Sequence, residues 1–438
     1  MKGNFTKNII HTFLVSSLSV PISILVSIVV ARSLGPEGKG IYAVVTSAMA
    51  LLIAVGQFGF LEVLLFQMRH DRRQPSKLAA NALVIALIGS IIAAGILVSV
   101  YPLVKGSFLK GVSKELLWLA YLLVPFNLVF LSFQRLLHLD GLIAKYNLLV
   151  LLSSVSTLIA TYAMLRVQPG EPGAAVLGIV TSMVLMSLVA VMLVKKKVAP
   201  DSWRVDTPLL CESIRQGSIV QGGMILHLLG QYAGIFILNY LLDSQQVGWF
   251  STAVGLSNMM LLVSNSTRTV LQGWMPSASE MPERVIEMTI VFARITVIIL
   301  CALGILLAVF GLPVIRIMYG YQFELSYSPM LMLLFGVVAR GMGQIVVSQL
   351  ALNKQFAVDT GAAALSLIAN IALTWLLIPK FGMYGAALSA AVGNIAQTLF
   401  LTYWFIQKSG RSFLEFLPKL SDARLFFNVV KPLFSQRG

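Results

Sequence analysis

Long apolar runs separated by short polar segments dominate the pattern of this sequence. A helix needs roughly 20 mostly apolar residues to cross a membrane, and the runs reach this length. The ten-residue alternation of membrane β-strands is not seen, so we expect helices. Twelve spans are predicted, at about 9–31, 41–66, 78–104, 116–137, 146–165, 173–194, 219–241, 248–271, 290–315, 329–352, 361–378 and 384–406.

The longest polar interruption divides these spans into two groups of six. The predicted fold class is therefore all-α, a polytopic membrane protein with two six-helix lobes. The expected domains are an N-terminal lobe at 1–194, a cytoplasmic connector at 195–218, a C-terminal lobe at 219–406 and a basic amphipathic cytoplasmic tail at 407–438.

Composition and charge agree with a protein that lies in lipid. Hydrophobic residues make up 58% and charged residues 11% of the 438, whereas soluble domains carry about 25% charged residues. The net charge of +15 is spread over short loops and forms no basic face, which argues against a nucleic-acid partner. Two cysteines provide neither a disulfide framework nor a metal cluster. With both termini cytoplasmic, the cytoplasmic side carries three times as many Lys and Arg residues as the other side, which supports that orientation.

Two stretches of the first half recur in the second. "GKGIYAVVTSA" resembles "QVGWFSTAVGL", and "PGAAVLGIVTS" resembles "YGAALSAAVGN". Gly40 and Gly248 are 208 positions apart, and Gly173 and Gly385 are 212 apart. These near-equal offsets favour a duplicated pair of six-helix halves, related by an axis along the membrane normal. The alternative is that small residues recur because they let membrane helices pack closely.

Several motifs carry a family resemblance. "VVARSLGPEGKGIYAVV" (29–45) resembles the first periplasmic turn of bacterial polysaccharide flippases of the O-antigen and exopolysaccharide type. "QQVGWFSTAVGLSNMM" (245–260) and "WMPSAS" are similar to that family's eighth helix and the loop after it, and "ANIALTWLLIPKFGMYGAALSAAVGN" (369–394) to its last two helices. The family belongs to a superfamily that also holds multidrug (MATE) exporters and lipid II flippases. Asn239 departs from its pattern, because relatives often carry aspartate there.

The resemblance implies a MATE-like fold and a function. Such a protein would move an undecaprenyl-diphosphate-linked oligosaccharide from the cytoplasmic to the periplasmic leaflet of the bacterial inner membrane by alternating access. A multidrug exporter is the alternative, and an enzyme is not expected. No cofactor or metal is expected, and the chain has no G-x-x-x-x-G-K-[ST] nucleotide loop. The expected partners are the lipid-linked oligosaccharide and the bilayer, with a polysaccharide polymerase and other assembly proteins as further candidates.

Arg340 lies near the middle of the tenth predicted span, where a charge is costly. Gln344 and Ser348 follow at steps of four and share its helix face. The planar guanidinium can donate paired hydrogen bonds to a diphosphate. We therefore predict a cargo-binding face formed by Arg340, Gln344 and Ser348. The alternative is an arginine bonded to carbonyls or a carboxylate between helices.

Further polar residues lie in the seventh and eighth spans. Ser251, Asn258, Asn265 and Gln272 are spaced by seven and would form one polar stripe, with Arg268 beside it. Amides suit sugar hydroxyls, but bonds between helices would also explain them. His227 and Gln231 lie one turn apart on the seventh span. The candidate cavity residues are thus Arg340, Gln344, Ser348, Asn258, Asn265, Arg268, His227 and Gln231.

Two residues are candidates for ion coupling. His227 is a candidate because histidine is the side chain type that can change charge near neutral pH, although a lone membrane histidine more commonly bonds a neighbouring helix. Glu62 is the acidic residue that lies well inside a predicted span. It would either pair with an arginine, respond to protons or lie at the membrane interface.

Overall fold

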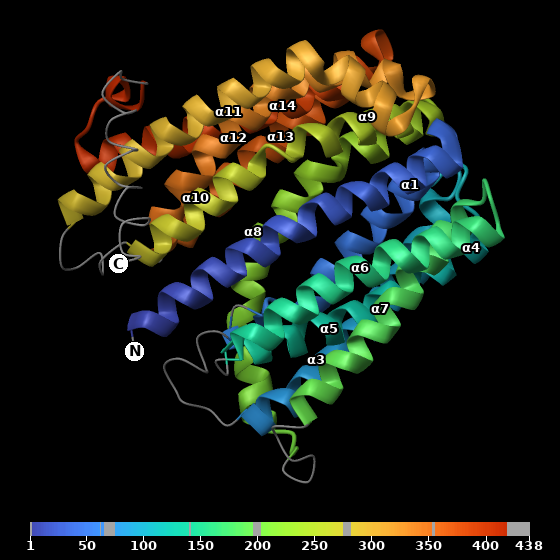
Figure 1. Ribbon diagram of the computed structural model, residues 1–438, viewed down its shortest axis with the longest axis horizontal. Coiled ribbons are helices and arrows are strands. Elements are labelled where there is room, and N and C mark those ends of the chain that lie inside the picture. The colour runs from blue at the N-terminus through green and yellow to red at the C-terminus, as the bar shows by residue number, and fades with distance from the viewer. Residues whose placement is uncertain are drawn as a thin grey trace. The chain divides into compact units, whose positions relative to one another are not determined.

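The computed structural model describes residues 2–61, 63–64, 75–139, 142–195, 203–274, 282–352 and 355–417. Within these ranges all regular elements are helical, and no strand occurs. The contacts divide the chain into two compact units, Met1–Gly248 and Trp249–Gly438. The first unit contains α1 (Lys2–Gln57), α3 (Pro75–Val104), α4 (Lys114–Tyr121), α5 (Leu123–Leu139), α6 (Ile143–Val167), α7 (Pro172–Lys195), α8 (Thr207–Leu241) and the start of α9 (Ser244–Asn258). The second contains the rest of α9, α10 (Leu261–Trp274), α11 (Pro282–Tyr319), η2 (Tyr321–Ser326), α12 (Tyr327–Leu352), α13 (Phe356–Phe381), α14 (Met383–Ser409) and η3 (Phe413–Phe416) (Figure 1).

The predicted membrane spans are confirmed at the level of length and composition. The described residues contain 11 helical segments long and apolar enough to cross a membrane. The first of them, Leu18–Gln57, includes most of both initial predicted spans. The others match the remaining predicted spans to within a few residues at most ends, so the protein is a polytopic all-α membrane protein.

A sharp bend divides α1 into two arms. Its backbone leaves helical geometry at Gly35, where φ is 65°, and Pro36 follows. The Lys39 ammonium donates to the Ser27 hydroxyl over 2.8 Å and to the Ser27 carbonyl. In a straight helix twelve residues span ~18 Å, so this contact requires the chain to turn. The "SLGPEGKG" stretch is thus the turn between the first two predicted spans.

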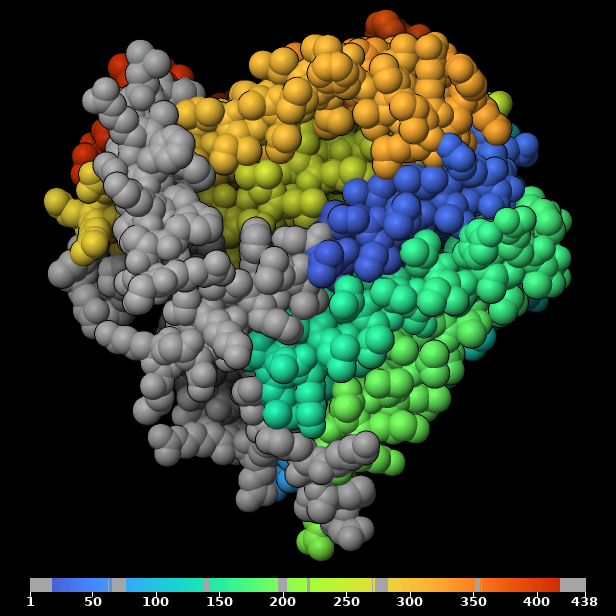
Figure 2. Space-filling model, in the orientation of Figure 1, coloured from blue at the N-terminus to red at the C-terminus, as the bar shows by residue number. Residues whose placement is uncertain are grey.

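Exposed apolar side chains cover the outer surface of the first unit. Figure 2 shows α1, α6 and α7 in succession on one face, and α6 packs between the other two. Leu148 and Ile159 of α6 are 52% and 62% exposed, and Leu188 and Met192 of α7 are also exposed. Water would penalise such a surface, whereas lipid tails solvate it.

The matched glycines of the internal repeat make a reciprocal contact. A Cβ added to Gly40 would lie 1.7 Å from the Ser244 carbonyl oxygen, and one added to Gly248 would lie 1.8 Å from the Pro36 carbonyl oxygen. Pro36 and Ser244 are separated by the same 208 positions as the two glycines. Matched positions of the two repeats thus touch matched carbonyls, and each glycine is required by a close backbone approach.

The helix that contains the seventh predicted span (219–241) begins earlier than that apolar run does. Asp206 caps α8, which runs from Thr207 to Leu241, so the second half of the predicted 195–218 connector is helical. Leu209 and Leu210 of this part lie in the core of the first unit. The hydropathy pattern missed it because a half-buried helix outside the lipid core carries polar residues on its other face.

The predicted tail is described only as far as residue 417. α14 continues to Ser409, and η3 follows with a capping box formed by Ser412 and Glu415. Phe416 is buried and packs edge-on against Phe405, with ring centroids 5.4 Å apart. The start of the tail is thus anchored in the second unit, and residues 418–438 lie outside the described part of the chain.

Candidate functional site

Arg340, Gln344 and Ser348 lie along one side of α12. Arg340 and Gln344 are half-buried and Ser348 is fully buried. Phe335 of the same helix is 75% exposed. At about 100° per residue, Gln344 lies about 180° from Phe335. The predicted face therefore points away from the most exposed side of α12.

The side-chain chemistry differs along this face. The Ser348 hydroxyl donates to the Gln344 backbone carbonyl over 3.0 Å, so it is used within the helix. The side-chain carbonyl oxygen of Gln344 is buried and has no hydrogen-bond partner among the described residues. A buried acceptor without a donor is costly, so Gln344 can accept a hydrogen bond from water or a ligand. The role of all three in cargo binding stays a prediction.

Small residues hold α12 in place on the adjoining side. Gly336 packs against Ala391 of α14, and Gly343 packs against Thr398 about two turns further along that helix. The Thr398 hydroxyl also donates to the Ala339 carbonyl over 2.8 Å. This carbonyl immediately precedes Arg340, so the contact with α14 fixes the backbone that carries the arginine.

α10 crosses α12 next to Arg340. A Cβ added to Gly341 would lie 2.6 Å from the hydroxyl oxygen of Ser264, which shows how closely the two helices approach. The Ser264 side chain is fully buried, and its hydroxyl has no partner among the described residues. Sequence reasoning missed Ser264 because a serine within an apolar run is common at helix contacts.

Asn265 and Arg268 lie beside Ser264 on α10. Asn265 and Thr269 are exposed, and Arg268 is half-buried, whereas Leu261 and Leu271 are buried. Polar side chains exposed on a membrane span normally face a water-filled path or protein, because exposure to lipid is costly. Asn265 and Arg268 thus lie within about one turn of Ser264, which packs against α12 beside Arg340, and their sharing of one cavity with Arg340 stays a prediction.

The eighth predicted span is broken, and this corrects the idea of one continuous stripe. α9 ends at Asn258 and α10 begins at Leu261. The amides of Met259, Met260, Leu262 and Val263 each bond the carbonyl three residues earlier, which is tighter than an α-helix. Half-buried Asn258 stands at this break. The side chain of Gln272 lies outside the described residues.

The other candidates belong to the first unit or to undescribed residues. His227 and Gln231 lie one turn apart on α8, and both are half-buried. Glu62 lies outside the described residues. The structure leaves the coupling roles of His227 and Glu62 as predictions. In the described ranges no group of three or more His, Cys, Asp and Glu residues is placed to hold a metal ion.

The chemistry of the crossing suits an anion that also carries hydroxyl groups. Arg340 and Arg268 bring positive charge, and Asn265 and Gln344 bring amide donors and acceptors. The residues described at this crossing include no carboxylate that could pair with an organic cation.

A protein-family model matches residues 5–281, and its description is polysaccharide biosynthesis protein. The match covers most of the chain. The chain belongs to the polysaccharide biosynthesis protein family. Comparison with curated proteins gives no match.

Solved structures show which fold this family member has. The lipid II flippase MurJ in an inward closed conformation is 15% identical, with a TM-score of 0.73, and the match covers 97% of this chain and 92% of MurJ. An inward-facing multidrug resistance MATE family transporter of the MOP superfamily is 15% identical, with a TM-score of 0.72 and coverage of 90% and 94%. A MOP superfamily transporter from Pyrococcus furiosus is 14% identical, with a TM-score of 0.67 and coverage of 92% and 96%. The MATE-like fold expected from the sequence resemblance is thereby confirmed.

The structure gives a physical role to Asn239, the asparagine at a position where relatives often carry aspartate. This α8 residue is 1% exposed, and its side-chain amide donates to the carbonyls of Phe108 and Lys110 over 3.0 Å each. Ser244 donates to its side-chain oxygen over 3.3 Å. Both amide hydrogens are thus used to hold the α3–α4 loop to the end of α8. An ionised aspartate would offer these carbonyls no hydrogen.

We expect Asn239→Asp to lower the stability of the folded protein by at least about 2 kcal/mol, because two buried carbonyls lose their donors. The midpoint of thermal unfolding in detergent, followed by size-exclusion chromatography, measures the change. Asn265→Asp is the matched control, since it makes the same chemical change at an exposed position. Equal midpoints for the two variants would contradict the assigned role of the Asn239 amide.

Proposed function

We propose that this family member is a flippase for a polyprenyl-diphosphate-linked oligosaccharide. It moves the lipid-linked repeat unit from the cytoplasmic to the periplasmic leaflet of a bacterial inner membrane by alternating access, with both termini cytoplasmic. The product would feed cell-surface polysaccharide synthesis, where a polymerase and other assembly proteins are the expected partners. The two lobes at 1–194 and 219–406 belong to the same proposal.

The observation that carries this proposal is the polar crossing of α10 and α12. Arg340 and Arg268 lie within apolar spans, where an isolated charge costs about 2.5–3.5 kcal/mol on insertion scales. A span keeps such residues when they serve a polar path or a protein partner. A diphosphate can accept the paired donors of an arginine, and sugar hydroxyls can bond the amides of Asn265 and Gln344. The family match and the MOP fold support the same conclusion.

Reconstitution into vesicles tests the function. Purified protein is placed in liposomes that contain a polyprenyl-diphosphate oligosaccharide, and a membrane-impermeant glycosidase reports how much cargo reaches the outer leaflet. At the start the glycosidase reaches about half of the cargo, the part in the outer leaflet. We expect the fraction that it cleaves to rise with time towards all of the cargo. Protein-free liposomes and a fluorescent phosphatidylethanolamine in place of the cargo are the controls.

The same vesicles test the alternative exporter. A multidrug transporter would move a fluorescent organic cation and leave the diphosphate lipid in its original leaflet. Movement of the cation without movement of the lipid-linked oligosaccharide would overturn the proposal.

A further inference from the structure

The end of the connector and the first half of α8, residues 203–221, are bound to the first unit by three kinds of contact. We infer that this segment, named here the anchor segment, is a permanent part of the first unit. It stays attached to α1, α3 and α5 throughout the transport cycle, although it precedes the second set of six spans in the sequence. The inference rests on the proposed function, because it concerns a transport cycle.

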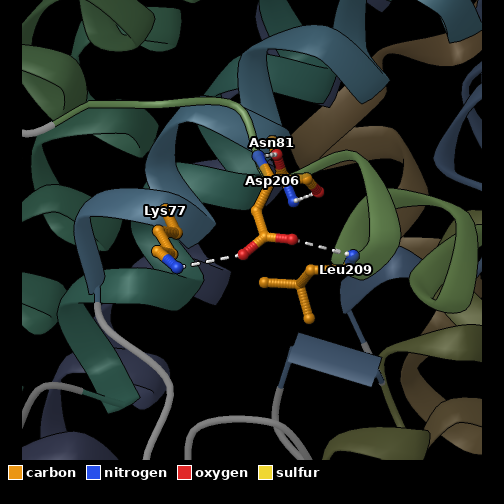
Figure 3. A network of polar contacts seen from close by, with 4 residues as sticks. All are labelled: Lys77, Asn81, Asp206 and Leu209. Atoms are coloured by element: carbon orange, nitrogen blue, oxygen red, sulfur yellow. Dashed lines mark hydrogen bonds and ion pairs between the residues drawn. The ribbon is translucent and has the colours of Figure 1, made fainter.

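The first contact is a polar network around Asp206 (Figure 3). One carboxylate oxygen accepts from the Leu209 amide over 3.1 Å, and the other accepts from the Lys77 ammonium over 3.1 Å. The Asn81 side-chain amide donates to the Asp206 carbonyl, and its oxygen accepts from the Asp206 amide, both over 3.1 Å. Asn81 is fully buried. Separation of the two segments would leave this buried amide without either partner.

The second contact is apolar. Leu209 and Leu210 are 2% and 8% exposed, and they belong to one buried cluster with Leu78 of α3 and Phe133 of α5. The Trp203 ring lies 5.8 Å from the Phe133 ring, measured between centroids. Detachment of the anchor segment would expose this cluster to water near the end of the bundle, which the hydrophobic effect opposes.

The third contact joins two backbones. A Cβ on Gly217 would lie 2.1 Å from the Phe58 carbonyl oxygen, and one on Gly59 would lie 2.1 Å from the Gly217 carbonyl oxygen. One turn further along α8, the Gln221 side chain donates to the Ala54 carbonyl in the second arm of α1. The anchor segment is thus held along its whole length, from Asp206 to Gln221.

A gate that opens in every cycle is the opposing interpretation of these contacts. A gate would separate α8 from the end of α1 and from α3. The burial of Asn81, Leu209 and Ser213 argues against it, since all three are 2% exposed or less. Separation would expose the apolar cluster to water and leave the buried Asn81 amide without its partners, so repeated opening at this contact would be costly.

A reversible cross-link tests the inference. Lys77→Cys and Asp206→Cys are combined in a background that carries Cys211→Ser and Cys301→Ser, and Asn81 is kept. A short bis-methanethiosulfonate then joins α3 to the anchor segment. We expect cross-linked protein to move the lipid-linked oligosaccharide at a rate within twofold of the uncross-linked variant. A loss of tenfold or more that dithiothreitol reverses would overturn the inference.

Two controls define the range of this assay. A monofunctional methanethiosulfonate modifies the same cysteines without joining them, so it separates the effect of the link from the effect of modification. Arg340→Ala shows the signal of a transport-deficient protein.

Hydrogen exchange decides the same question without any cargo. The wild-type protein is studied in lipid nanodiscs. We expect the exchange rates of the amides of residues 209–217 to differ by no more than about tenfold from those of residues 78–86 in α3. Exchange at least a hundredfold faster in the anchor segment would overturn the inference. If the wild-type protein moves no cargo, the proposed function fails, whereas hydrogen exchange still tests the attachment.

Discussion

Replacement of Arg340 with alanine is expected to slow transport of the lipid-linked oligosaccharide about 100-fold or more. The fork of an arginine can make two charge-assisted bonds to a diphosphate, each worth about 1.5–3 kcal/mol. A factor of ten corresponds to about 1.4 kcal/mol, so the loss of both bonds reaches two orders of magnitude. Arg340→Lys keeps the charge but loses the planar fork, and we expect a smaller loss of about tenfold. Initial rates in the vesicle assay measure both.

The matched control for this prediction is Arg166→Ala. Arg166 lies at the end of α6, where it bonds the hydroxyl of Tyr162 and is exposed. Its removal deletes the same side chain and the same charge, and we expect rates within twofold of wild type. Unchanged transport by Arg340→Ala would exclude the arginine from the site. A fall in folded protein that fully accounts for the fall in rate would instead assign it a structural role.

The second large effect is expected at the reciprocal glycine contact. Gly40→Ala would place a methyl group 1.7 Å from the Ser244 carbonyl oxygen, and Gly248→Ala would place one 1.8 Å from the Pro36 carbonyl oxygen. Neither position can relax by rotation of a flexible side chain, because the opposing atoms are backbone. We expect each substitution to cost about 3 kcal/mol or more and to reduce the yield of monodisperse protein. Thermal unfolding in detergent and the yield after size exclusion measure it.

Gly95→Ala is the matched control for the glycine contact. Gly95 lies in α3, and an added Cβ would meet no atom within 4 Å. Alanine favours a helix over glycine by up to about 1 kcal/mol, so Gly95→Ala should unfold at the wild-type midpoint or slightly above it. If Gly40→Ala and Gly248→Ala both unfold at the wild-type midpoint, the segments at 36–40 and 244–248 can move apart at little cost, and the prediction is wrong.

The membrane spans could be predicted almost to their ends. Hydropathy is local, and a lipid core selects for runs of one length, so the segments at 173–194 and 384–406 match α7 and α14 closely. The family could also be predicted, because "VVARSLGPEGKGIYAVV" combines a turn with specific small residues. Only the structure shows why a glycine stands at position 40: the Ser244 carbonyl occupies the space that a larger side chain would need.

The candidate site could be predicted only in part. Helix periodicity places Arg340 and Gln344 on one face, and the structure shows that this face is not the exposed one. The same reasoning treated Ser251, Asn258, Asn265 and Gln272 as one stripe, but the turn at Met259 and Met260 divides it. Ser264 was missed because only the approach of α12 at Gly341 distinguishes it from other serines in apolar runs.

The sequence by itself determined the helical fold class, the number and limits of the spans, the family and the residues that bear charge in lipid. These follow from interactions within about 25 neighbouring residues and from the solvent that surrounds them. Only the tertiary structure decided that α8 begins at Thr207 and is anchored by Asn81, that Asn239 binds two carbonyls, and that Gly40 meets Ser244. The partners in these contacts lie more than a hundred positions apart. A local pattern of hydrophobicity does not specify which distant carbonyl a buried amide will bond, or which distant backbone will pack against a glycine.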